Sequence, residues 1–170
     1  MPQVAYRAVR SRRKFVKAPQ IVRCVGAEMD RRVKPHFIRQ FNDVVSDWNH
    51  KPKFKARKVI SGESIKLFVF PAGKNKKIWT YVSRGTRRHK IRPKKPGGLL
   101  AFTLGYSART KARGKAHVGT GKATGDRVFA AEVDHPGTEA REFEEVIADE
   151  NKGWYSRTME SIWRRCIRRA

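Results

Sequence analysis

Five histidines and two cysteines are the side chains of this sequence with the most scope for chemistry. They are His36, His50, His89, His117 and His135, with Cys24 and Cys166. None of the histidines has a second ligand at the short spacing that zinc sites use, and the cysteines are not near them in the sequence. We therefore expect no metal site and no cofactor.

Nuclease-type acid–base catalysis is the second chemistry to consider. His117 and His135 lie near Asp126 and Asp134, but these residues complete no recognisable nuclease pattern. Gly119-Thr120-Gly121-Lys122 is a weak echo of a phosphate-binding loop without the strand–loop–helix context. The sequence predicts no catalytic residue and a protein that is not an enzyme. A small, basic RNA-cleaving toxin stays open as an alternative.

The two cysteines have a simpler expected role. Cys24 and Cys166 are far apart and lack metal-ligand spacing. We expect unpaired thiols in a reducing compartment.

The charge is large and unevenly distributed. The 170 residues include 40 Lys and Arg against 15 Asp and Glu, a net charge of +25. Residues 51–127 hold 22 of the basic residues and two acids, whereas residues 132–150 hold eight of the acids. Such a chain meets a polyanion or an acidic protein surface, and its segregation suits contact between identical subunits. No apolar run approaches about 18 residues, so we expect no membrane partner.

Apolar periodicity predicts the elements that hold these charges. Residues 1–18 form a basic arm, either a short edge strand or a disordered tail. Residues 19–48 carry an apolar stripe with helical spacing, which Pro35 should kink near Lys34. The period then changes to two, which predicts a mostly antiparallel sheet over about 52–133.

Within that sheet, residues 78–82 are expected to form a strand, and residues 99–104 should pair with 128–133 around a long mobile loop at 105–127. A C-terminal helical region follows at about 144–169, with a break at Gly153. The predicted fold class is α+β: one domain over 19–170, with the sheet packed on the long N-terminal helix.

A sharp corner separates the basic sheet from the acidic segment. Pro136 lacks a backbone donor and biases His135 toward an extended conformation, and Gly137 allows a positive φ. We interpret this corner as an assembly feature and not as an active site.

A set of short motifs around two corners resembles a known family. The motifs are Trp79-Thr80-Tyr81-Val82, Gly85-Thr86-Arg87-Arg88-His89-Lys90-Ile91, Pro93-Lys94, Leu100-Ala101-Phe102, Val133-Asp134-His135-Pro136-Gly137-Thr138, and Ala140-Arg141 with Phe143. In this order they resemble the tail-component proteins (tail-completion or neck proteins) of long-tailed bacteriophages, over about two-fifths of the chain. Glu142 stands where that family usually has Pro.

The resemblance implies a structural virion protein, a head–tail connector or tail-completion subunit. It implies a homo-oligomeric ring of roughly six or twelve subunits around the DNA channel between portal and tail tube. Its partners would be neighbouring neck and tail proteins and phage DNA, bound without sequence specificity. Its location would be the neck of the particle, after assembly in the bacterial cytoplasm. A non-catalytic nucleic-acid-binding protein is the main alternative.

Three groups of site residues follow from this interpretation. The contacts to DNA or to an acidic partner are assigned to Arg87, Arg88, Lys90, Arg109, Lys111, Arg113 and Lys115. The structural corners are assigned to Gly85, Thr86, His135, Pro136 and Gly137. The acidic subunit contacts are assigned to Glu139, Glu142, Glu144 and Glu145.

Overall fold

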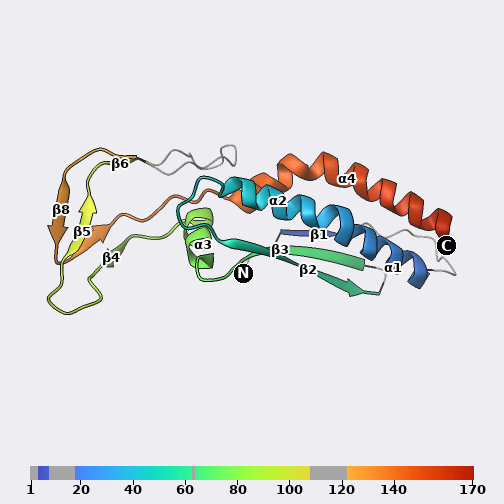
Figure 1. Ribbon diagram of the computed structural model, residues 1–170, viewed down its shortest axis with the longest axis horizontal. Coiled ribbons are helices and arrows are strands. Elements are labelled where there is room, and N and C mark those ends of the chain that lie inside the picture. The colour runs from blue at the N-terminus through green and yellow to red at the C-terminus, as the bar shows by residue number, and fades with distance from the viewer. Residues whose placement is uncertain (1–3, 8–17, 63, 108–121) are drawn as a thin grey trace. The chain divides into compact units, whose positions relative to one another are not determined.

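The computed structural model describes residues 4–7, 18–62, 64–107 and 122–170 (Figure 1). Every strand pair in this part of the chain is antiparallel, and the chain ends in a long helix, so the predicted α+β class is confirmed. The chain divides into two compact units, described separately below. Unit 1 comprises Met1–Asp43, Lys53–Ala72 and Glu144–Ala170, and unit 2 comprises Val44–Pro52 and Gly73–Phe143. The prediction of a single domain stays a prediction.

The N-terminal helical stretch runs from residue 18 to residue 44 as three joined elements. These are α1 (Ala18–Glu28), the π-helical segment η1 (Met29–Val33) and α2 (Lys34–Val44). Pro35 has no N–H for the carbonyl four residues before it. The preceding turn widens instead, and the Lys34 N–H donates to the Met29 carbonyl. The predicted interruption at Lys34 is confirmed, but the helix ends at Val44 rather than at residue 48.

A three-stranded sheet packs against these helices. Its order is β1 (Val4–Arg7), β3 (Ser64–Ala72) and β2 (Lys53–Ser61), so β3 is the central strand. Residues 4–7 of the basic arm therefore form the edge strand that was one of its two expected states. The inner face of the β2–β3 hairpin meets the helices, with the Phe54 and Phe41 rings 5.1 Å apart.

The core of unit 1 lies between this sheet and the helices. Its buried side chains include Ile21, Val25, Met29, Val33, Phe37 and Phe41 from the N-terminal helices, Phe54, Ile65, Leu67 and Val69 from the sheet, and Ile147, Met159, Ile162 and Cys166 from α4 (Phe143–Arg169). Helix α4 packs on α2 through His36, whose ring stacks on Trp154 at 3.6 Å and whose Nε2 lies 2.7 Å from the Asn151 Oδ1. The helices lie on one side of the sheet (Figure 1).

Helix α4 is continuous across Gly153, so the predicted break is wrong. A glycine inside a helix costs only about 1 kcal/mol relative to alanine. Buried residues on both sides of it, such as Ile147 and Ile162, hold the two halves in one packed helix. No described helix combines the length and the apolarity that crossing a bilayer requires.

Unit 2 contains a helix where the sequence predicts a strand. Residues Lys76–Arg84 form α3, which buries Trp79 against Trp48 and Phe143, at ring distances of 6.2 and 5.1 Å. The β-branched and aromatic residues at 78–82 favour a strand locally. Packing of the Trp79 ring in this aromatic cluster outweighs that preference, so the strand prediction is wrong.

The rest of unit 2 consists of two-stranded ribbons. They pair β4 (His89–Ile91) with β9 (Val133–His135), β5 (Leu100–Thr103) with β8 (Arg127–Ala130), and β6 (Tyr106–Ser107) with β7 (Lys122–Ala123). The predicted continuous sheet over 52–133 is thus divided among the described strands. The predicted strand at 128–133 is also divided, because its first half pairs with β5 and its end pairs with β4.

Candidate assembly site

The two corners of the family-like motifs meet in unit 2. The Thr86 N–H donates to the Thr138 carbonyl at 2.9 Å, and the Thr138 N–H donates to the Thr86 carbonyl at 3.0 Å. Two segments 52 residues apart are thereby joined by a reciprocal pair of backbone hydrogen bonds. The corner residues Gly85, Thr86, Pro136 and Gly137 all belong to this junction or flank it directly.

Both corner glycines are required by geometry. Gly85 has φ of +72°, and a Cβ there would collide with the Thr138 carbonyl oxygen. Gly137 has φ of +99°, and a Cβ there would collide with the Thr86 carbonyl oxygen. Because the obstacle is backbone in each case, no side-chain rearrangement relieves the clash.

The two histidines at this site are engaged by the backbone. His89 lies opposite His135 in the β4–β9 pair, with the ring centroids 5.1 Å apart. The Gly137 N–H donates to the Nδ1 of His135 at 3.0 Å, and the Nδ1 of His89 lies 2.8 Å from the Arg87 carbonyl oxygen. Within the described residues, no group of three or more His, Cys, Asp and Glu side chains is arranged to hold a metal ion. We therefore interpret the two histidines as structural residues of the corner.

The chain leaves the corner along α3. The N–H groups of Arg141 and Glu142 donate to the Ser83 carbonyl at 3.0 and 2.8 Å, and the Phe143 N–H donates to the Ser83 hydroxyl oxygen at 3.2 Å. Glu142 has φ of +51°. Proline is confined to φ near about −65° and has no N–H. This exit is thus closed to the Pro that the family usually has there.

Arg141 is the buried charge of this corner. Its side chain is buried, and its Nε and Nη1 atoms have no hydrogen-bond partner among the described residues. Burying an unpaired guanidinium is costly.

Two of the predicted basic contacts are neutralised within the chain. Arg88 forms a two-pronged ion pair with Asp134, and Lys90 and Arg92 both bind the Glu132 carboxylate, Lys90 at 2.6 Å. The Arg88 hydrogen bond lowers the pKa of Asp134, and the Lys90 and Arg92 hydrogen bonds lower the pKa of Glu132. The segregated charges therefore meet across the β4–β9 ribbon, in addition to any contact between subunits.

The other predicted contacts lie in several places. Arg87 is exposed beside the corner, and Arg109, Lys111, Arg113 and Lys115 lie outside the described residues. Among the acids, Glu139 and Glu145 are exposed, whereas Glu142 and Glu144 are half-buried. Glu144 and Glu145 occupy the first turn of α4, where the helix dipole favours negative charge.

The predicted pairing of residues 99–104 with the first half of 128–133 is confirmed as the β5–β8 ribbon, but the exposed apolar surface of this ribbon was not predicted. Phe129 lies opposite Ala101 and is 61% exposed, while Leu99 and Leu104 at the ends of β5 are 63% and 48% exposed. The Phe102–Val128 pair on the other face is only half-buried. The sequence did contain a signal for this surface. Residues 99–102 are apolar at consecutive positions, and a strand of that kind normally has both of its faces covered.

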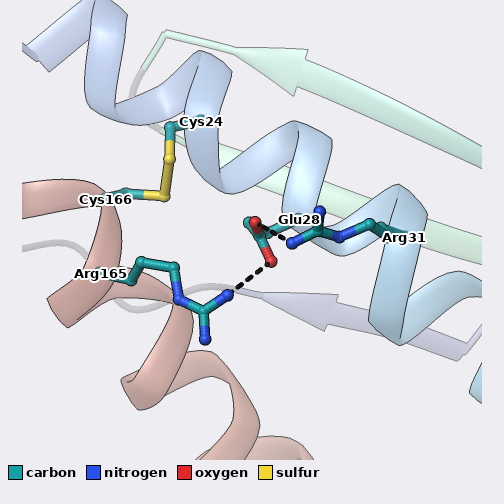
Figure 2. Close-up of a disulfide and its surroundings, with 5 residues drawn as sticks. All are labelled: Cys24, Glu28, Arg31, Arg165 and Cys166. Carbon is teal, nitrogen blue, oxygen red and sulfur yellow. Dashed lines mark hydrogen bonds and ion pairs between the residues drawn. A yellow bond between two sulfur atoms is a disulfide. The ribbon is translucent and has the colours of Figure 1, made fainter. Parts of the chain in front are cut away.

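The two cysteines form a disulfide, so the prediction of unpaired thiols is wrong. Cys24 on α1 and Cys166 on α4 are bonded, with their Cα atoms 5.7 Å apart (Figure 2). One turn away, the Glu28 carboxylate, 5% exposed as a residue, binds Arg31 at 2.6 Å and lies 3.7 Å from the Arg165 guanidinium. The two cysteines are 142 positions apart in the sequence, and only the antiparallel packing of α1 and α4 brings them together, so no local pattern predicted the pair.

Comparison with protein-family profiles, with curated protein sequences and with solved structures gives no match for this chain. The class of protein must therefore be argued from the residues and their arrangement.

Proposed function

We propose that this chain is a structural virion protein of a tailed bacteriophage, a neck or head–tail connector (tail-completion) subunit. It forms a homo-oligomeric ring around the DNA channel between portal and tail tube, and it contacts neighbouring neck and tail proteins. Its work is assembly, and no residue is assigned a catalytic role.

The observation that carries this proposal is the β5–β8 ribbon. An isolated two-stranded ribbon is marginally stable in water. Phe129 on this ribbon and Leu99 and Leu104 beside β5 are exposed, and burying these apolar side chains against a partner would be favourable. Its strands β5 and β8 have no second strand partner among the described residues, so their outer edges are open to another chain. We infer that a neighbouring subunit covers it.

The corner residues support the same proposal. The Gly85-Thr86 and Pro136-Gly137-Thr138 motifs carry the resemblance to the tail-completion family, and they converge on one junction. Nearly all of that junction is backbone hydrogen bonding and steric fit. Residues used in this way serve to orient an element, and the element that follows β4 in the chain is the β5–β8 ribbon.

The disulfide is compatible with the proposed location in the virion. A bacterial cytoplasm keeps thiols reduced, whereas a released particle is in an oxidising medium. A protein assembled in the host would carry Cys24 and Cys166 as thiols, and the bond would close in the free virion.

The test compares Phe129→Ser with a matched control, Tyr81→Ser. Tyr81 is also an exposed aromatic residue of unit 2, 53% exposed, but it lies on α3 and not on the ribbon. In sedimentation velocity, we expect the parent and Tyr81→Ser to form one discrete oligomer and Phe129→Ser to shift to monomer. A parent that stays monomeric, or two variants that behave alike, would overturn the proposal.

A further inference from the structure

The outer face of the unit 1 sheet combines cations and aromatic rings in a pattern that the assembly role does not use. In an antiparallel pair, residues directly opposite each other share a face. Lys55 lies opposite Phe70, and Arg57 lies opposite Phe68. Lys53 and Lys66 lie on the same face, which is the face turned away from the buried Phe54, Leu67 and Val69.

The charge of this face is of one sign. Lys53, Lys55, Arg57 and Lys66 are exposed, and no acidic residue lies on this face among the described positions of β2 and β3. No ion pair joins any of these four cations to a described carboxylate. The contrast with Lys58 is informative, because Lys58 points to the inner face and pairs with Asp30 at 2.5 Å and with the Gly26 carbonyl at 2.7 Å. Lys58, the one cation on the inner face of the described β2 and β3 strands, is thus neutralised within the chain, whereas the four cations of the outer face are not.

The two rings lie in the middle of this charged face. Phe68 and Phe70 are half-buried residues of the central strand β3, two residues apart and therefore about 7 Å apart along it. The Arg57 guanidinium carbon lies 5.9 Å from the centre of the Phe68 ring, which is a cation–π arrangement. The helices of unit 1 lie on the opposite side of the sheet (Figure 1).

We propose that this face binds single-stranded nucleic acid without sequence preference, with Lys53, Lys55, Arg57 and Lys66 on the phosphates and Phe68 and Phe70 stacking on bases. Consecutive outward cations on β2 are about 7 Å apart, so Lys53, Lys55 and Arg57 form a row about 14 Å long beside the two rings. A cationic track beside aromatic rings is how sequence-tolerant single-strand binding proteins hold their ligand. A duplex would use only the cations, because its bases are stacked on each other. An acidic polypeptide without apolar side chains would likewise use only the cations.

This inference goes beyond the ring proposal, and its test is kept separate from it. The assay uses the Phe129→Ser chain as well as the parent, so that binding is measured whether or not the protein assembles. The probes are a labelled oligothymidylate, the corresponding thymidine–adenine duplex and polyglutamate. Fluorescence anisotropy measures the binding of each probe over a range of salt concentrations.

Four cations on phosphates predict a slope of log K against log salt of about −3 for the single strand. Lys55→Gln with Arg57→Gln should make that slope shallower by roughly 1.4. The control Lys94→Gln with Lys95→Gln removes the same charge from exposed residues of unit 2 and should leave the slope unchanged. Equal changes in both pairs would mean that only net charge matters, and would overturn the proposed face.

The rings are tested by Phe68→Leu with Phe70→Leu, which keeps apolar volume on β3 and removes the aromatic faces. We expect about a tenfold or greater loss of affinity for the single strand, with the slope unchanged and little loss for the duplex. Far-ultraviolet circular dichroism and the thermal midpoint identify any variant that has lost its fold, and Phe68→Tyr with Phe70→Tyr should restore binding. Unchanged single-strand affinity in the folded leucine variant, or equally tight binding of polyglutamate by the parent, would refute the proposal.

Discussion

Units 1 and 2 are stabilised in different ways. Unit 1 packs its helices on a three-stranded sheet, buries a continuous set of aliphatic and aromatic side chains, and joins α1 to α4 by a disulfide. Unit 2 has one aromatic cluster around Trp48, Trp79 and Phe143. Its described strands form two-stranded ribbons that carry exposed apolar residues. The difference supports the proposal that a neighbouring subunit covers the ribbon of unit 2.

The largest expected effect comes from opening the disulfide in unit 1. In the chain-entropy description, a bond between cysteines 142 positions apart stabilises the fold by up to about 5 kcal/mol, and removal of a native disulfide typically costs about 2–5 kcal/mol. We expect Cys24→Ser with Cys166→Ser to lower the free energy of unfolding of unit 1 by that order, measured by urea titration. Hydrogen exchange in the β4–β9 ribbon of unit 2 should not change. If hydrogen exchange showed an equal loss of protection in unit 2, the disulfide would not stabilise unit 1 selectively.

The next largest effect should come from the corner of unit 2. Gly137→Ala puts a methyl group against the Thr86 carbonyl at a positive φ, and we expect a cost of about 2–4 kcal/mol. Gly97→Ala is the matched control, because Gly97 also has a positive φ, +70°, but no atom within 4 Å of an added Cβ. It should cost only about 1 kcal/mol. Thermal unfolding measures the stability of both variants, and amide exchange at Thr86 and Thr138 reports on the corner. An equal loss of stability in Gly137→Ala and Gly97→Ala would contradict the steric argument.

A smaller effect on stability, but a large one on assembly, is expected from the exposed ribbon. Phe129 loses little packing on mutation because it is 61% exposed, so Phe129→Ser should change the free energy of unfolding of the free chain by less than about 0.5 kcal/mol. The buried Trp79→Ala of the same unit should cost about 3–5 kcal/mol. If Phe129→Ser unfolds the isolated chain, the ribbon is part of a core and not an open surface.

The smallest effect should come from acid. The lowered pKa values of Asp134 and Glu132 mean that their ion pairs stabilise the folded state above the ordinary carboxyl pKa, near about 4. This contribution is lost as pH falls through the lower folded-state pKa values. We expect amide exchange in β4 and β9, corrected for its intrinsic pH dependence, to show a looser ribbon at about pH 3 than at about pH 6. Added salt should mimic part of this loosening, because the pairs are exposed. A ribbon equally protected at both pH values would contradict the role of these pairs.

Long segments with a periodic apolar pattern were predictable from the sequence. Which distant segments pack or bond together was not. The stripe from Ile21 to Phe41 and the alternation around Phe54 each fix a buried face by local spacing, so the helices and the hairpin followed directly. The segment around Trp79 has strand-like residues, but a tertiary aromatic cluster decides its conformation. The pairing of Cys24 with Cys166 depends on how two distant helices pack, which no local pattern encodes.

The candidate site shows the same division. Pro136 fixes its φ angle and Gly137 allows a positive φ, so the turn itself was predictable. Its partner, the Gly85-Thr86 corner, was predictable as a turn but not as a contact. The cations of Arg88 and Lys90 were assigned to an outside partner because their neighbours Asp134 and Glu132 are distant in sequence. Only the β4–β9 register brings them together.

Native mass spectrometry of the parent chain and of Phe129→Ser across a concentration series tests the central claim most directly. That claim is that a second copy of this chain covers the β5–β8 ribbon of unit 2. We predict a single oligomer of defined mass for the parent and monomer for Phe129→Ser at the same concentrations. A parent that remains monomeric throughout the series would contradict the claim.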